Sequence, residues 1–242
     1  LLVTSLNGDL NPRRIERYLA AARESGAEPV IVLTKADACS DGEARRAAIE
    51  AIAGGAAIHL VSALTGAGMD DLSAHLTPCQ TAALLGSSGV GKSTLVNALA
   101  GEAVMETSAI SGDDKRGRHT TTHRELILLP SGALLLDSPG MRELGLWDAE
   151  EGVSATFEDV EALIGACRFS DCQHRREPGC AVREALESGA LDKGRWGAYN
   201  KLQRELAFEA RKEDPALRAQ ATKRWAKVHK NTRARMKFTG KY

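Results

Sequence analysis

A glycine-rich motif in the middle of the chain constrains the fold more than any other feature. Gly86, Gly91, Lys92 and Ser93 occupy the fixed positions of the pattern G-x-x-x-x-G-K-[ST]. An apolar run, 82–85, precedes the motif, and apolar residues at helical spacing follow it. A strand-to-helix turn without a ligand is the alternative. The complete pattern in this context favours a loop that binds a nucleoside triphosphate.

The residue types of this loop explain why it would bind phosphate. Glycines let the backbone N–H groups curl around phosphate oxygens, beside the positive end of the following helix. We expect Lys92 to act catalytically on the β- and γ-phosphates, and the Ser93 hydroxyl to bind Mg²⁺. The predicted phosphate-binding residues are Gly86, Ser87, Ser88, Gly89, Val90, Gly91, Lys92, Ser93 and Thr94.

A loop far upstream predicts which base is bound. The apolar, β-branched run 29–33 is a predicted strand, and a tetrapeptide of the form [NT]-K-x-D follows it. This form resembles the guanine-specificity motif of GTPases, in which Asp37 would accept hydrogen bonds from guanine N–H groups while the Lys35 stem lies along the base. Alone, the motif is weak and an exposed loop is the better interpretation; its weight comes from the other motifs. The predicted base-binding residues here are Thr34, Lys35, Ala36 and Asp37.

The order of the motifs is unusual for a GTPase. Another predicted strand, 57–61, ends in Ser62 and Ala63, and this pair resembles the second base-contacting loop, where the Ala63 amide would meet the guanine carbonyl. Both base-reading loops precede the phosphate loop, whereas in ordinary small GTPases they follow it. The order predicts a circularly permuted sheet, which is tolerated where the original termini lie close together on the surface.

The predicted first switch follows the phosphate loop. A polar segment, 108–117, is a predicted mobile loop that leads to three threonines, 120–122. One of them would bind Mg²⁺ and sense the γ-phosphate, and we favour Thr121. A threonine-rich strand edge is the alternative. His119 is the leading candidate to position the attacking water, although a structural histidine or a group from a partner would also fit.

The predicted second switch comes after two more strands, 125–129 and 133–136. Residues 137–140 match the motif D-x-x-G. Asp137 would hold Mg²⁺ through water, and the Gly140 N–H would contact the γ-phosphate. The next residue is Met141, where many GTPases carry a glutamine that orients water. This absence is why His119 is considered for that role.

A cluster of metal-ligand residue types marks the region beyond a predicted linker, 144–148, and a predicted helix, 156–164. Its spacing is C-x₄-C-x-H-x₅-C. Three thiolates and one imidazole suit a tetrahedral structural Zn²⁺ site with no open position. Reduced thiols beside a surface histidine are the alternative. The predicted zinc ligands are Cys167, Cys172, His174 and Cys180.

The end of the chain is basic, although the formal net charge of the whole chain is +0. Two helices are predicted, at 192–210 and 215–230, and no Asp or Glu follows Asp214. Such a tail suits salt-sensitive contact with RNA phosphates, and a solvated, disordered tail is the alternative. No apolar run approaches the roughly 20 residues of a membrane span, so we expect no membrane partner. Five cysteines, an odd number, fit a reducing cytoplasm.

Taken together, these residues resemble the bacterial ribosome small-subunit-dependent GTPase A family over the whole chain. The resemblance rests on motifs 34–37, 86–94, 117–122 and 137–140, in permuted order, and on the cysteine and histidine spacing. It implies an α/β fold: a circularly permuted P-loop GTPase sheet, 1–148, with a small helical zinc-binding domain, 149–242.

The resemblance also implies a function. Members of this family act late in maturation of the 30S ribosomal subunit, with GTP hydrolysis stimulated by the subunit and a zinc domain that contacts 16S rRNA. The implied ligands are GTP or GDP, Mg²⁺ and one structural Zn²⁺, and we expect a monomer. The family's N-terminal oligonucleotide-binding barrel is not expected in this chain. A GTP-dependent RNA-binding switch that serves another RNA or protein partner is the alternative.

Overall fold

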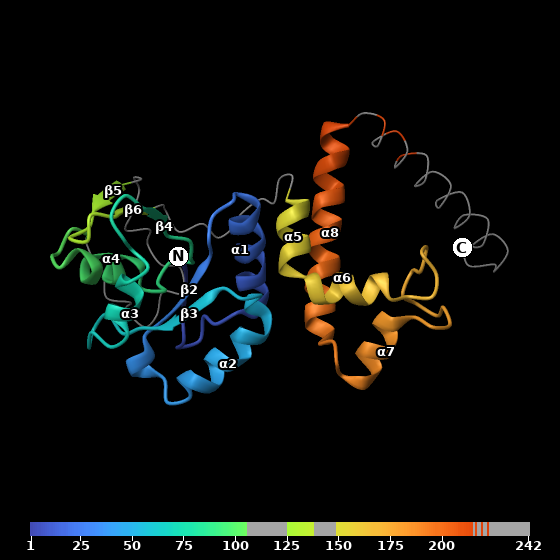
Figure 1. Cartoon of the computed structure of the whole chain (residues 1–242), viewed down its shortest axis with the longest axis horizontal. Helices are drawn as coiled ribbons and strands as arrows, with labels where there is room; N and C mark the ends of the chain where they lie inside the picture. The colour runs from blue at the N-terminus through green and yellow to red at the C-terminus, as the bar shows by residue number, and fades with distance from the viewer. Residues whose placement is uncertain (106–124, 138–148, 215, 217–218, 220–221, 223–242) are drawn as a thin grey trace, which may run out of the picture.

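A parallel sheet forms the N-terminal part of the molecule (Figure 1). The computed structural model describes residues 1–105, 125–137 and 149–214, together with 216, 219 and 222. The sheet has the order β1-β2-β3, with strands β1 (Leu2–Ser5), β2 (Val30–Thr34) and β3 (Ala57–Leu60). In its register Val3 pairs with Val32, and Val32 pairs with His59. The strands predicted at 29–33 and 57–61 are confirmed as β2 and β3.

A second sheet extends the first. It has the order β4-β6-β5, with strands β4 (Thr81–Ala83), β5 (Glu125–Leu128) and β6 (Leu134–Asp137). β4 and β6 are parallel, whereas β5 and β6 are antiparallel. Beyond β4, the Val3 N–H donates to the Leu85 carbonyl at 2.7 Å, and the Leu85 N–H donates to the Leu1 carbonyl at 2.9 Å. The two sheets therefore join along β1, so that the phosphate-loop segment lies beside the strand that opens the chain.

Helices cover both faces of these sheets. They are α1 (Pro12–Glu24), the short 3₁₀ turn η1 (Ala36–Ala38), α2 (Gly42–Ala53), α3 (Met69–Ser73) and α4 (Lys92–Ala100). Alternate residues of a strand point to opposite faces. Accordingly, Ile31 and Leu33 pack with α1 and α2, while Val30 and Val32 pack with α3 and α4. This is the arrangement of a doubly wound α/β sheet.

Within the described residues after 149, four helices follow: α5 (Glu150–Thr156), α6 (Glu158–Gly165), α7 (Ala181–Ser188) and α8 (Lys193–Glu213). The helix predicted at 156–164 corresponds to α6, which begins two residues later, whereas α5 was not predicted. Two helices meet at Phe157, whose buried ring is shared between them. α7 was not predicted. The helix predicted at 192–210 is confirmed, and most of the helix predicted at 215–230 lies outside the described residues.

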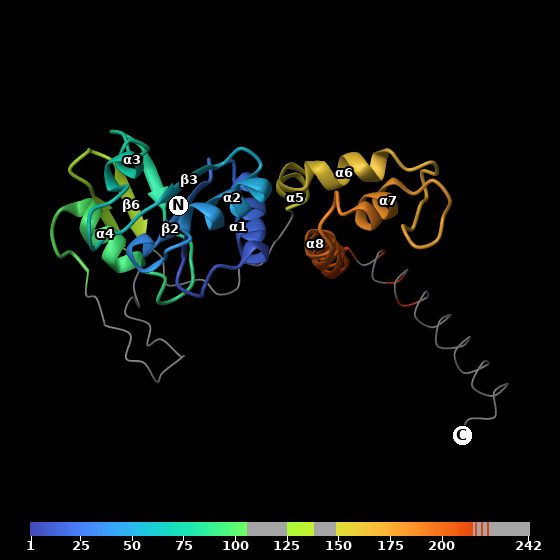
Figure 2. The ribbon, with the colours of Figure 1, turned by 90° about the horizontal axis from the view of Figure 1, so that it is seen from below.

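Two of the C-terminal helices, α5 and α8, lie against α1, and in Figure 1 α5 lies between α1 and α8 (Figures 1 and 2). α1 and α5 approach closely at Gly152, because a Cβ atom there would lie 2.1 Å from the Ala20 carbonyl oxygen. A side chain at this position would force the helices apart. Within the described residues, no helix combines the length and apolar character that crossing a membrane requires.

Candidate functional site

The phosphate loop has a conformation that depends on its glycines. A Cβ atom at Gly86 would lie 2.4 Å from the Val3 carbonyl oxygen, so only glycine fits against β1. Gly89 and Gly91 have φ angles of 82° and 97°, in the left-handed region that L side chains rarely adopt. Gly91 caps the N-terminus of α4. The glycine spacing noticed in the sequence therefore corresponds to one close approach and two left-handed turns.

Lys92 lies inside the curve of this loop. Its ammonium donates to the carbonyl oxygens of Gly86 at 3.0 Å and Ser87 at 2.9 Å. Burial lowers the pKa of Lys92, while the negative charges of Asp137 and Asp9 oppose that shift. Asp137 is fully buried at the end of β6. The predicted phosphate-binding lysine and the predicted Mg²⁺-binding carboxylate thus face the same site.

The predicted guanine motif is joined directly to the phosphate loop. The Thr34 hydroxyl donates to the Val90 carbonyl at 2.5 Å, and the Lys35 ammonium donates to the Gly89 carbonyl at 3.0 Å. Lys35 itself has a φ angle of 60°, a strained conformation for a residue other than glycine. These bonds bring together two segments that are more than fifty positions apart in sequence.

Asp37 is oriented by a residue of the second base loop. The Ser62 hydroxyl donates to an Asp37 carboxylate oxygen at 2.5 Å, and Ser62 is buried. The Ala36 N–H also donates to the Val61 carbonyl at 3.2 Å. Ser62 was predicted to belong to the base site, and this hydrogen bond indicates how it would contribute. It holds the carboxylate that would read guanine.

Most residues of the two predicted switches lie outside the part of the chain that the structure describes. His119, Thr121 and Gly140 lie outside the described residues, as does Met141. Ser93 lies in the first turn of α4, partly buried, next to Lys92. The nucleotide site as described therefore consists of the phosphate loop, the two base loops and Asp137.

A second cluster of candidate ligands gathers in the C-terminal region. One ligand atom from each of Cys167, Cys172, His174 and Cys180 lies within 4.8 Å of all the others. The His174 Nδ1 atom is 3.5 Å from the Cys167 Sγ atom and 3.6 Å from the Cys180 Sγ atom. Tetrahedral zinc bonds of about 2.3 Å to sulfur and 2.0 Å to nitrogen imply a separation of about 3.5 Å. The donor set and its spacing therefore fit such an ion.

Local backbone features form this cluster. His174 adopts a φ angle of 57°, which turns the chain between its second and fourth ligands. Cys180 caps α7, since its sulfur accepts the Arg183 N–H at 3.4 Å. The Glu177 carboxylate accepts the N–H groups of Arg175 and Arg176 at 2.8 and 2.9 Å. These backbone N–H groups lower the pKa of Glu177 to about 2. Through the same hydrogen bonds, the Glu177 carboxylate closes the loop.

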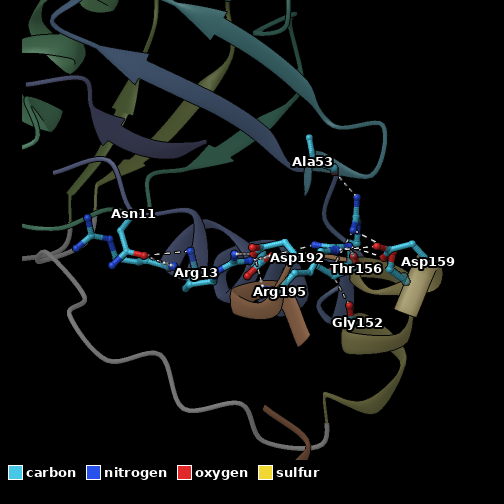
Figure 3. Close-up of polar contacts among 12 residues, drawn as sticks. Asn11, Arg13, Ala53, Gly152, Thr156, Asp159, Asp192 and Arg195 are labelled. Carbon is cyan, nitrogen blue, oxygen red and sulfur yellow. Dashed lines mark hydrogen bonds and ion pairs between the residues drawn. The ribbon is translucent and has the colours of Figure 1, made fainter. Parts of the chain in front are cut away.

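The C-terminal helices dock on α1 through ion pairs that the sequence did not predict (Figure 3). The Arg195 guanidinium contacts the buried Glu16 carboxylate at 2.8 Å and the Asp159 carboxylate at 2.6 Å. It also donates to the Thr156 carbonyl at 2.9 Å and lies over the Phe157 ring, 4.7 Å from its centroid. One side chain of α8 therefore holds together α1, α5 and α6.

Further contacts extend this junction along α1. Arg17 pairs with Glu205 of α8 at 2.6 Å. Arg23 donates to the Thr156 hydroxyl at 3.0 Å and to the Ala53 carbonyl at 2.8 Å, so it links α5 to the end of α2. Nothing in the sequence distinguished these arginines from those of a solvated helix face, because their partners lie more than a hundred positions away or on another helix.

Comparison with known proteins decides the family of the chain. Residues 1–147 match the model of the RsgA GTPase family. The chain belongs to the RsgA GTPase family. The RsgA relatives include the small ribosomal subunit biogenesis GTPase RsgA of Opitutus terrae, which is 51% identical over 100% of this chain and 66% of its own length. A Listeria monocytogenes protein, small ribosomal subunit biogenesis GTPase RsgA 2, is 48% identical over 98% of this chain and 68% of its own length. The chain spans about two thirds of the length of these relatives.

Solved structures of similar proteins agree with the fold. The crystal structure of YjeQ from Thermotoga maritima matches with a TM-score of 0.60 and 30% identity, over 85% of this chain and 69% of that one. YloQ, described as a circularly permuted GTPase, matches with a TM-score of 0.56 and 28% identity, over 85% of this chain and 67% of the YloQ chain. The predicted α/β fold of a permuted GTPase is confirmed, with a Cys and His cluster that could hold zinc in its C-terminal region.

Proposed function

We propose that this chain binds and hydrolyses GTP as part of a factor that acts late in maturation of the small ribosomal subunit. The observation that carries the proposal is the pair of bonds from Thr34 and Lys35 to the phosphate loop. They join a base-reading loop and a phosphate-binding loop into one site. The names of the RsgA relatives, small ribosomal subunit biogenesis GTPases, support the ribosomal assignment.

Each nucleotide group has a residue in this proposal. Asp37, held by Ser62, accepts from the guanine N–H groups, and the Ala63 amide contacts its carbonyl. Backbone N–H groups of residues 86–94 and the Lys92 ammonium hold the phosphates. Ser93, Asp137 and Thr121 would hold Mg²⁺, which neutralises charge on the phosphates when bound. The Gly140 N–H senses the γ-phosphate, and His119 positions the attacking water.

The C-terminal region supplies the contact with RNA. The four-ligand cluster holds one structural Zn²⁺, because three thiolates and an imidazole fill all four positions of a tetrahedral site. This region, 149–242, and the basic residues beyond Asp214 bind 16S rRNA of the 30S subunit through phosphate contacts. We further propose that residues 1–148 form the GTPase domain and that the chain works as a monomer in the cytoplasm. The factor binds the subunit with different affinity when GTP or when GDP is bound at the switches.

The proposal is tested by measuring GTP hydrolysis with and without purified 30S subunits at low and moderate salt. We expect slow turnover alone, and at least tenfold stimulation by the subunit that weakens as salt rises, because phosphate contacts release counterions. Purified 50S subunits serve as the control for nonspecific RNA. Guanine nucleotide binding without 30S stimulation, repeated with a full-length relative as the positive control, would contradict the ribosomal assignment.

A further inference from the structure

One face of α8 carries positive charges and a single aromatic ring. Side chains that recur at intervals of three, four, seven and eight residues share a face of a helix. Glu205 and Glu209 border this face, and they pair with Arg17 of α1 and with Lys212. We call it the basic face of α8, and it consists of Lys193, Lys201, Arg204, Phe208, Arg211 and Lys212.

The basic face of α8 is exposed, whereas the opposite face is buried. Phe208 is 52% exposed, and the cations are exposed except for Arg211, which is partly buried. On the opposite face Arg195, Leu202 and Leu206 are buried. In Figure 2, which looks along α8, the helices α5, α6 and α7 lie on one side of it. The basic face is therefore turned away from the packed interior of the C-terminal region.

The aromatic ring on this face is surrounded by charge. The Lys212 Nζ atom lies 4.6 Å from the centroid of the Phe208 ring, and the Arg211 Cζ atom lies 6.0 Å from it. Lys212 also donates to the Glu209 carboxylate at 2.8 Å, which helps to hold it beside the ring. Phe208 belongs to none of the hydrophobic clusters of the described residues. Its exposed ring therefore offers a stacking surface next to cations.

We propose that the basic face of α8 binds a single-stranded segment of RNA. Phe208 stacks on an unpaired base, while the lysines and arginines around it contact the phosphates. Positive charge continues past the helix, because no Asp or Glu follows Asp214 in the sequence. The inference rests on the proposed function, since it names the kind of RNA that the C-terminal region contacts.

The ring distinguishes single-stranded RNA from other anionic partners. Duplex RNA presents phosphates, but its bases are stacked on one another and offer no free face to Phe208. A helix that lies on a membrane buries a broad apolar face, whereas the basic face has one ring among five cations. Base stacking and phosphate contact together use both kinds of side chain that this face presents.

The test measures RNA binding by the whole chain. Fluorescence anisotropy gives the Kd for a labelled single-stranded oligoadenylate of about twelve nucleotides and for a duplex RNA of the same length, over a series of salt concentrations. We expect the single strand to bind more tightly. Phe208→Leu, which keeps an apolar side chain and removes the ring, should raise the Kd for oligoadenylate about fivefold or more.

The salt dependence separates stacking from charge. Arg204→Gln should reduce the slope of log K against log salt by about 0.7, since one phosphate contact to a single strand is lost. Phe208→Leu should leave that slope unchanged. The matched controls are Arg46→Gln on α2 and Leu128→Ala on β5, because both side chains are exposed and lie outside the basic face. Neither control should change the Kd or the slope.

Two results would overturn the inference. One is an unchanged Kd for oligoadenylate in Phe208→Leu, and the other is a wild-type chain that binds the duplex at least as tightly as the single strand. Vesicles that contain phosphatidylglycerol are tested in parallel, and binding to them as tight as to oligoadenylate would assign this face to a membrane instead. A wild-type chain that binds oligoadenylate through Phe208 but is not stimulated by 30S subunits would contradict the proposed function alone.

Discussion

At the scale of single residues, the proposed nucleotide site contains one carboxylate whose orientation is set by a neighbour. Asp37 projects from the short turn η1, and its position is fixed by the Ser62 hydroxyl at 2.5 Å. A carboxylate has only acceptors, so it complements the N–H groups of guanine. An amide at the same place would present a donor, and the base that complements it carries a carbonyl there.

The Asp37→Asn variant should therefore exchange guanine for xanthine. We expect at least tenfold weaker GTP binding, since a hydrogen bond to a charged group contributes about 1.5–3 kcal/mol, together with improved binding of xanthosine triphosphate. Competition titration against a fluorescent nucleotide measures both. Asp41→Asn, in the same loop and paired with Arg45 at the surface, should change neither affinity. Equal losses for both nucleotides in Asp37→Asn would argue against base reading by Asp37.

At the scale of elements, α1 and α8 are joined by a buried pair of charges. Glu16 is fully buried and Arg195 nearly so. Burial raises the pKa of Glu16, while Arg13 and Arg195 oppose the rise. Removing Arg195 leaves the buried Glu16 carboxylate with Arg13 alone, at 2.8 Å, and also takes away the Arg195 pair with Asp159, which is strongly destabilising. The junction therefore depends on both residues being present together.

Replacing Arg195 by Met should lower the free energy of unfolding by about 3–5 kcal/mol. Urea denaturation followed by circular dichroism measures this loss. The matched control is Arg46→Met, whose surface pair with Glu43 spans 3.6 Å and contributes below about 1 kcal/mol. A loss for Arg195→Met no larger than the control's would show that the junction carries little stability.

The sign of the pH dependence follows from the buried carboxylate. In Arg195→Met the folded-state pKa of Glu16 rises further above its ordinary value of 4.5, because burial then acts with less opposition. The folded state binds more protons than the unfolded state between these two pKa values, so stability falls as pH rises through that window. We expect the deficit relative to wild type to be larger at pH 8 than at pH 5.

At the scale of the whole molecule, the metal cluster and the junction make the C-terminal region one body with its own core. Phe157, Val160, Cys180 and Val182 are all buried in it. His174 also lies edge-on to Trp196 of α8, with ring centroids 5.5 Å apart. The loop that contains the metal ligands is thereby connected to the same helix that docks on α1.

Removing the metal should disorder the metal-binding loop and leave the nucleotide site intact. We expect about one zinc per chain by elemental analysis, and less than a fifth of that in Cys172→Ser. Limited proteolysis should then cut between residues 165 and 181, whereas the Kd for GDP changes less than about twofold. Cys79→Ser, an exposed thiol outside the cluster, is the control. Full zinc content in Cys172→Ser would exclude this ligand set.

Local features of the sequence determined much of the fold and most of the site. Glycine spacing located the phosphate loop, because a left-handed turn and a close approach to Val3 both exclude side chains. Apolar runs located the strands β2 and β3 of the first sheet. Metal-ligand residue types within fourteen positions located the cluster. In each case the physical cause acts over a few neighbouring residues.

The tertiary structure alone decided which distant groups meet. The pairing of Arg195 with Glu16 spans 179 positions, and that of Arg17 with Glu205 spans 188; periodicity carries no signal over such lengths. The break at Phe157 and the close packing at Gly152 likewise depend on α1 and α8 being present. Buried charges and tight helix contacts are stabilised by their partners, so they become visible only once the chain has folded.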